Sequence, residues 1–66
     1  MEAMGKTIRA LRKEQGLSQA QLAFEAGITR NQIVSIESGK ANFTMKTLLL
    51  ICSVLNVRPP DIWPQD

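Results

Sequence analysis

Residues 19–39 read QAQLAFEAGITRNQIVSIESG, and this stretch decides the fold. Small and apolar side chains recur at helical spacing on both sides of Gly27, which predicts two short helices joined by a tight turn. Glycine suits such a turn because it lacks a Cβ and adopts a positive φ without strain. Ser18 and Thr29 are each followed three positions later by glutamine, a capping-box pattern that marks the start of a helix. We therefore expect a pair of crossing helices within residues 18–38.

Helical periodicity continues on both sides of this pair. We expect a first helix over about residues 3–15, ended by a glycine, and a fourth helix over about residues 45–55, preceded by Thr44 as its N-cap. A short last turn should begin near Pro59. Phe24 faces outward on a helical wheel, and we expect it to pack over the end of the first helix. No stretch alternates long enough to indicate a strand, so the sequence predicts an all-α, compact bundle of five helices.

Length and composition restrict the possible functions. With 66 residues the chain is expected to form a single domain, residues 1–66. It contains one cysteine and no histidine, which argues against zinc sites, histidine-based catalysis and a disulfide framework. The longest apolar run, residues 48–52, is too short to cross a membrane, and no signal peptide is visible. We expect a cytoplasmic protein that is not an enzyme and has no cofactor, metal or membrane partner.

Charge and side-chain type point to a polyanion as the partner. Residues 1–46 carry seven of the eight basic side chains and four of the six acidic ones. A solvated helix face is usually rich in Glu and Lys, whereas the exposed face of the predicted third helix is rich in amides and hydroxyls and includes one cation. Such groups bind base edges and phosphates. The side chains are Thr29, Arg30, Asn31, Gln32 and Ser35.

The segment from Gln19 to Gly39 resembles the helix-turn-helix of the Cro and phage-repressor family, and the resemblance extends over about residues 4–63. It includes the entry Ile8-Arg9-Ala10-Leu11-Arg12 and the exit from Thr47 to Pro59. Membership would imply a five-helix, lambda-repressor-like domain with its helix-turn-helix at residues 18–38. It would also imply binding of operator DNA as a dimer, with the helix that starts at Thr29 in the major groove.

The resemblance also implies roles for single residues. Gln19 matches a residue that contacts the phosphate backbone, and three positions match residues that face base edges: Arg30, Asn31 and Ser35. Thr29 and Gln32 flank these positions, and two residues match the loop that follows the DNA backbone: Lys40 and Asn42. Arg12 and Glu37 match a buried ion pair. Physics favours that pairing, because a carboxylate beside DNA must be neutralised within the protein.

The predicted fourth helix is apolar almost all the way round, which indicates that it buries a second face. We expect a homodimer formed through residues 45–64, with an interface made by Leu50, Val54, Ile62 and Trp63. In the alternative interpretation, these residues pack locally on the C-terminal segment of the same chain.

The resulting prediction is a bacterial or phage transcriptional regulator that binds a two-fold symmetric operator in double-stranded DNA. Residues 37–44 look most like the controller proteins of restriction–modification systems, while small phage or chromosomal repressors and antitoxins stay open. No small-molecule ligand is expected. The competing hypothesis is an antitoxin-type or other protein-interaction module on the same fold. Such a module should expose apolar anchors on the third helix, where this sequence has polar groups.

Overall fold

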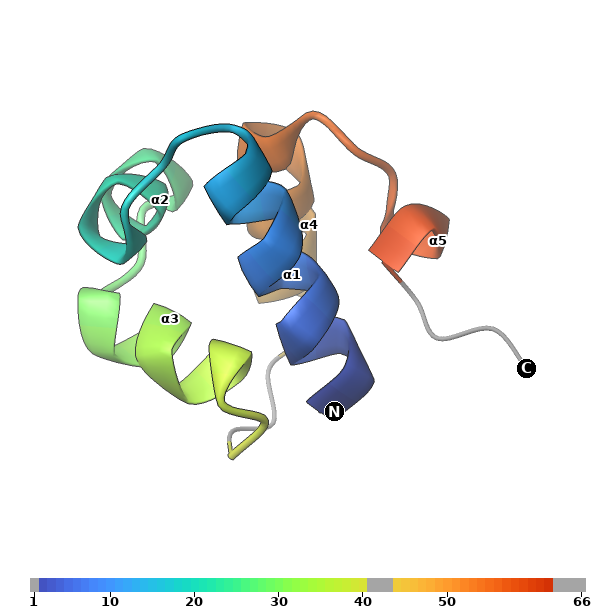
Figure 1. The fold of residues 1–66 in the computed structure, drawn as a ribbon, viewed down its shortest axis with the longest axis horizontal. Helices are drawn as coiled ribbons and strands as arrows, with labels where there is room; N and C mark the ends of the chain where they lie inside the picture. The colour runs from blue at the N-terminus through green and yellow to red at the C-terminus, as the bar shows by residue number, and fades with distance from the viewer. Residues whose placement is uncertain (1, 41–43, 63–66) are drawn as a thin grey trace.

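The computed structural model describes residues 2–40 and 44–62, and within them the chain forms five helices. Figure 1 shows α1 (Glu2–Glu14) crossing in front of α4 (Met45–Leu55), with α2 (Gln19–Ala26) and α3 (Arg30–Glu37) to one side and α5 (Pro59–Ile62) to the other. No strand occurs in these two ranges. The prediction of an all-α, five-helix bundle is confirmed.

Both predicted capping boxes are present. At the start of α2 the Ser18 hydroxyl accepts a hydrogen bond from the Gln21 backbone N–H at 3.0 Å, and the Gln21 side chain accepts from the Ser18 N–H at 2.7 Å. Thr29 and Gln32 repeat this exchange at the start of α3, at 3.1 and 2.8 Å. Each box uses the N-cap and third backbone amides of its helix, and leaves the first and second amides for another partner.

The turn between α2 and α3 is closed by backbone geometry. Gly27 has φ +75°, a left-handed conformation that L side chains rarely adopt. Its successor, Ile28, donates a backbone hydrogen bond to the Ala23 carbonyl at 3.0 Å, which completes the end of α2. Ala23 is buried, so its small side chain allows α3 to cross close to α2.

A contact that the sequence did not reveal holds α1 against α3. Gly5 is buried, and a Cβ at this position would overlap the carbonyl oxygen of Ile36 and lie 3.1 Å from that of Glu37. The absence of a side chain at Gly5 therefore lets the start of α1 pack directly on the last turn of α3. This contact fixes the direction of α3 relative to α1.

The remaining helices close the core from the other side. Thr44 caps α4 as predicted, and Asn56 ends it in the left-handed region at φ 58°. The side-chain amide of Gln15, just beyond α1, donates to the Leu55 carbonyl at 2.7 Å and so ties α1 to the end of α4. No helix in residues 2–40 or 44–62 is long and apolar enough to span a bilayer.

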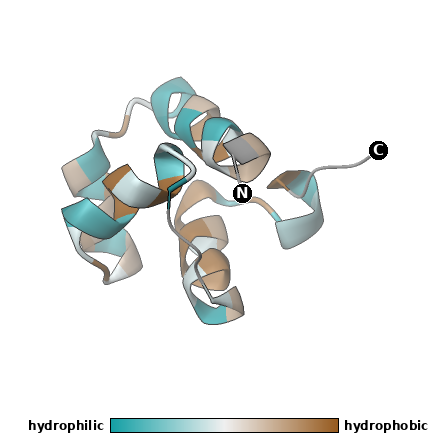
Figure 2. Cartoon of the chain, turned by 90° about the horizontal axis from the view of Figure 1, so that it is seen from below, coloured by the Kyte–Doolittle hydropathy of each residue, from teal (hydrophilic) through white to brown (hydrophobic). Residues whose placement is uncertain are grey.

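The core gathers side chains from all five helices, and α4 contributes four of them. Ile8, Leu22, Ile33 and Ile51 are fully buried at its centre. Figure 2 shows the uneven result: α4 is hydrophobic along most of its length, whereas polar and apolar residues are mixed along the other long helices. Phe24 does not pack on α1 as expected: it is 86% exposed, because it lies two positions from the buried Leu22 and Ala26 and therefore on the opposite face of α2.

Candidate nucleic-acid interface

A buried ion pair forms the foundation of the candidate site. The Arg12 Nε lies 2.7 Å from Glu37 Oε2, and Arg12 Nη2 lies 3.0 Å from Oε1, so the guanidinium grips the carboxylate with two parallel hydrogen bonds. Both side chains are nearly buried, with 9% and 4% of their surface exposed. Hydrogen bonding to Glu37 raises the pKa of Arg12 above its ordinary value, against the opposing effect of burial.

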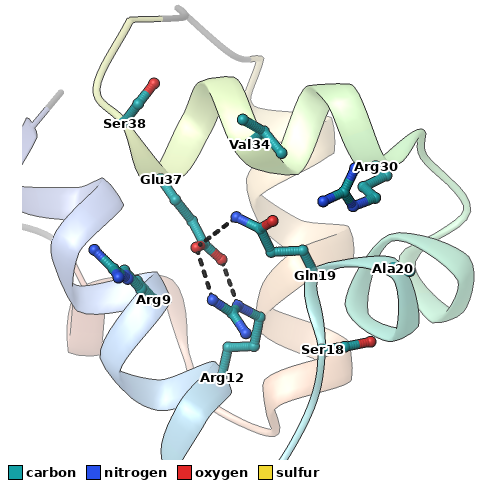
Figure 3. A pocket seen from close by; sticks show the side chains of 9 residues that line it. All are labelled: Arg9, Arg12, Ser18, Gln19, Ala20, Arg30, Val34, Glu37 and Ser38. Atoms are coloured by element: carbon teal, nitrogen blue, oxygen red, sulfur yellow. Dashed lines mark hydrogen bonds and ion pairs between the residues drawn. The ribbon is translucent and has the colours of Figure 1, made fainter.

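The pair also positions groups from the loop before α2 and from α2 itself. Arg12 Nη1 donates to the Leu17 carbonyl at 2.8 Å, which fixes the chain two residues before α2 begins. The Gln19 side-chain amide donates to Glu37 Oε1 at 3.3 Å. Side chains from α1, α2 and α3 therefore meet at the Glu37 carboxylate (Figure 3). Glu37 holds the Gln19 amide in place and is itself held by Arg12.

Above this network lies an open hollow of about 570 Å³ between α1, the start of α2 and α3. Arg9 from α1 and Arg30 from α3 flank it on opposite sides in Figure 3. Three arginines and one carboxylate line the hollow, so it carries an excess of positive charge that favours an anion. The full lining is Arg9, Arg12, Ser18, Gln19, Ala20, Arg30, Val34, Glu37 and Ser38.

The exposed face of α3 continues from the rim of this hollow. Arg30 and Asn31 are exposed and Ser35 is half-buried, whereas Ile33, Ile36 and Glu37 turn inward. The polar residues that the sequence singled out on this helix therefore face away from the core. Lys40 is exposed just beyond α3.

The other predicted site residues are placed differently from one another. Thr29 and Gln32 are exposed, but their side chains bond to each other and to backbone in the capping box. Asn42 lies outside the described residues. In the described part of the chain, no three His, Cys, Asp or Glu side chains gather to hold a metal ion.

Arg9 and Val34 line the hollow, and neither was assigned a role in it from the sequence. Only the packing of α1 on α3 brings Arg9 to the same hollow as Arg30, and that packing depends on the Gly5 contact. The signal for Val34 was present, since an apolar residue stands among polar ones on the exposed face.

The predicted dimer residues divide into three groups. Leu50 is 36% exposed and Val54 is half-buried against the core. Ile62 is a core residue at 2% exposure, so in this chain it supports α5 instead of presenting a surface. Trp63 lies outside the described residues. Met45 and Leu49, at 54% and 50%, are the more exposed apolar side chains of α4.

Two capped helices, a glycine turn between them and an outward polar face on the second helix make up the candidate interface. Residues 8–62 match the sequence model described as Helix-turn-helix. The chain belongs to the helix-turn-helix family. The match covers all but the first turns of α1 and the last residues of the chain, so the family resemblance seen in the sequence is confirmed.

Two solved structures superpose on all or nearly all of this chain. The restriction-modification controller protein C.AhdI from Aeromonas hydrophila superposes with a TM-score of 0.91 over 94% of both chains, at 31% identity. The P22 c2 repressor protein, solved in complex with a synthetic operator, superposes with a TM-score of 0.89 over the full length of both chains, at 27% identity. The lambda-repressor-like fold is thus confirmed.

One relative is longer than this chain. Antitoxin PezA from Streptococcus pneumoniae serotype 4 is 35% identical over 63 residues, which are 96% of this chain. The chain spans only 40% of the length of that relative.

Proposed function

We propose that this chain is a DNA-binding transcriptional regulator that places α3 in the major groove of double-stranded DNA. The observation that carries the proposal is the joint orientation of two sets of groups. The exposed polar face of α3 and the positively charged hollow beside it lie next to each other, so one duplex can meet both at once. An α-helix fits the major groove of B-DNA, where the base edges are distinguishable.

Each polar side chain on the exposed face of α3 suits a different contact with the bases. Arg30 suits a bidentate contact to guanine and Asn31 one to adenine, each contributing about 1–3 kcal/mol of discrimination. Ser35 lies one helical turn further along the same face and reaches either base type. The three residues together read a short run of bases, and they set which sequence is bound.

The hollow binds the backbone of the same half-site. The first two backbone amides of α2, at Gln19 and Ala20, are not used by the capping box and point their dipole at an incoming phosphate. The Gln19 carboxamide, fixed by Glu37, has a second N–H to donate, and Arg9 neutralises phosphate charge. These contacts orient the duplex without reading its sequence. We propose that Lys40 and Asn42, which follow α3 in the sequence, contact the DNA backbone.

A single domain offers few phosphate contacts, so we propose that the chain acts as a homodimer on a two-fold symmetric operator. We assign to the interface the exposed apolar side chains of α4, which are Met45, Leu49 and Leu50, and the half-buried Val54 on the same helix. Two recognition helices would then reach half-sites whose centres are about 34 Å apart. The single domain of residues 1–66 would combine both roles, with the helix-turn-helix at 18–38 and dimerisation within 45–64.

Selection of bound sequences from random duplex DNA, followed by measurement of affinity against salt, tests the proposal. We expect an enriched two-fold symmetric sequence and an affinity that falls steeply with salt. Arg30→Ala should lower affinity for the selected operator about tenfold or more per half-site while changing affinity for random DNA much less. Binding that is indifferent both to salt and to Arg30→Ala would refute a DNA-reading role.

One observation favours a second candidate function. Phe24 is 86% exposed on α2, and a large aromatic side chain in water is typical of a protein contact. In an antitoxin-type or other interaction module this residue would be an anchor. Phe24→Ala separates the two candidates, because it should leave operator affinity almost unchanged in a DNA regulator and abolish partner binding in an interaction module.

A further inference from the structure

Val34 is the large apolar side chain that α3 leaves exposed, with 38% of its surface in water. It lies one turn after Arg30 and one turn before Ser38, and all three line the hollow beside α3. Figure 3 shows the Val34 side chain directed from α3 towards the side of the hollow where Gln19 lies. The exposed positions around it, Arg30, Asn31 and Ser38, are polar.

The fold gives no reason for valine at this position. Ile33 and Ile36 fill the core beneath α3 at 0% and 2% exposure, and Val34 lies outside that core cluster. A β-branched residue also has lower helix propensity than alanine or the long polar residues that usually occupy an exposed helix position. A role in contact with another molecule accounts for an apolar side chain here better than stability does.

The groups that line the hollow with Val34 indicate what this side chain contacts. The hollow that Val34 lines is also lined by Arg30, which is assigned to a base edge, and by the start of α2, which is assigned to phosphates. The one apolar group on the major-groove edge of the bases is the 5-methyl of thymine. That methyl lies at the end of the base edge nearest the backbone of its own strand, which is where a side chain between base contacts and phosphate contacts arrives.

We propose that Val34 is a specificity-determining residue that packs on the 5-methyl group of one thymine in each half-site. The inference rests on the proposed function and deepens it: the polar side chains read hydrogen-bonding edges, and Val34 adds a requirement for thymine that no hydrogen bond supplies. Val34 thereby selects thymine over cytosine and over uracil at that position.

The test replaces thymine by deoxyuridine in the selected operator, one symmetric pair of positions at a time. This change removes only the methyl group and keeps base pairing. Removing one buried methyl should weaken binding about fourfold per half-site, or about fifteenfold for the symmetric pair. We expect one such pair for the wild-type protein, and a loss below about twofold at that pair for Val34→Ala.

Val34→Ala is a sound variant because alanine favours the helix and Val34 lies outside the core cluster. Phe24→Ala is the matched control: it removes an exposed apolar side chain that does not line the hollow, and it should keep the full penalty for deoxyuridine. Circular dichroism melting of the three proteins shows whether each is folded under the binding conditions.

Two results would overturn the inference. One is that wild-type protein binds its operator without sensitivity to any thymine methyl, or selects an operator without thymine. The other is that Val34→Ala retains the wild-type penalty at the sensitive pair. Both leave the proposed function intact, because operator binding is still observed. If wild-type protein shows no preference for any duplex sequence, the proposed function fails first and this inference with it.

Discussion

At the scale of single residues, the Arg12–Glu37 pair links stability to the candidate site. Removing one partner of a buried pair leaves an uncompensated charge, so Glu37→Ala should lower the free energy of unfolding by about 3–5 kcal/mol. That is comparable to the whole stability expected of a domain this small. Thermal melting followed by circular dichroism should show a largely unfolded variant.

The double variant Arg12→Met/Glu37→Leu provides the control for this prediction. Replacing both charges by apolar groups removes the unpaired charge, so this protein should be more stable than either single variant. It should still bind DNA less well than wild type, because Gln19 has lost the acceptor that positions it. A Glu37→Ala protein that melts within a degree or two of wild type would show that the pair is not needed for folding.

Arg9 has a predicted role that its neighbour Lys13 does not share. Both are exposed cations on α1, but only Arg9 lines the hollow. Arg9→Ala should therefore weaken binding to all duplex sequences alike and reduce the slope of log affinity against log salt by about 1 per domain. Lys13→Ala should leave the slope unchanged. Equal effects of the two substitutions would mean that the basic charge acts diffusely and not through the hollow.

At the scale of helices, the starts of α2 and α3 could be predicted because their signals are local. Each capping box lies within four consecutive residues, and so does the Thr44 cap of α4. The close approach of α1 to α3 could not be predicted, because it depends on residues 31 positions apart in the chain, Gly5 and Ile36. The same contact explains why Arg9 was missed as a member of the site.

The N-cap of α3 allows a quantitative prediction. The Thr29 hydroxyl accepts the Gln32 N–H, so Thr29→Ala should lower the free energy of unfolding by about 0.5–2 kcal/mol. Thr29→Ser keeps the hydroxyl and should lie close to wild type. Urea unfolding curves compare the three proteins. Identical midpoints for the alanine and serine variants would show that the cap contributes nothing.

Burial of Cys52 within α4 predicts how stability responds to alkaline pH. Desolvation raises the pKa of the folded thiol, with a further contribution from the charge of Asp61. Because the unfolded chain then loses the thiol proton first, stability is fully present below the ordinary thiol pKa and falls as pH rises towards the folded value. Over roughly pH 8 to 10, wild type should lose more stability than Cys52→Ala in urea titrations. Parallel pH profiles would contradict this.

At the scale of the whole molecule, the proposed dimer depends on the exposed apolar side chains of α4. The sequence assigned Leu50, Val54, Ile62 and Trp63 to a second buried face, but it could not show that α5 packs Ile62 into the core of the same chain. Ile62 proved to be a core residue, and Met45 and Leu49 the more exposed ones. Periodicity identifies an amphipathic helix, whereas the partition between core and interface depends on tertiary contacts.

Sedimentation at micromolar concentration tests the proposed dimer. Leu49→Lys should place a charge in the interface and shift the chain to monomer, and operator affinity should fall at least tenfold because the two half-sites no longer cooperate. Lys46→Ala, which changes an exposed charge on the same helix, should leave the dimer intact. A wild-type chain that sediments as a monomer with and without operator DNA would remove the dimer from the account.

Methylation interference on the selected operator shows whether α3 lies in the major groove. Dimethyl sulfate modifies guanine at N7 in the major groove and adenine at N3 in the minor groove, so one reagent reports on both. If α3 lies there, interference should come from guanine N7 in two clusters about one helical turn apart and should be weakened by Arg30→Ala. Interference from adenine N3 alone, with free tolerance of N7 methylation, would contradict this placement.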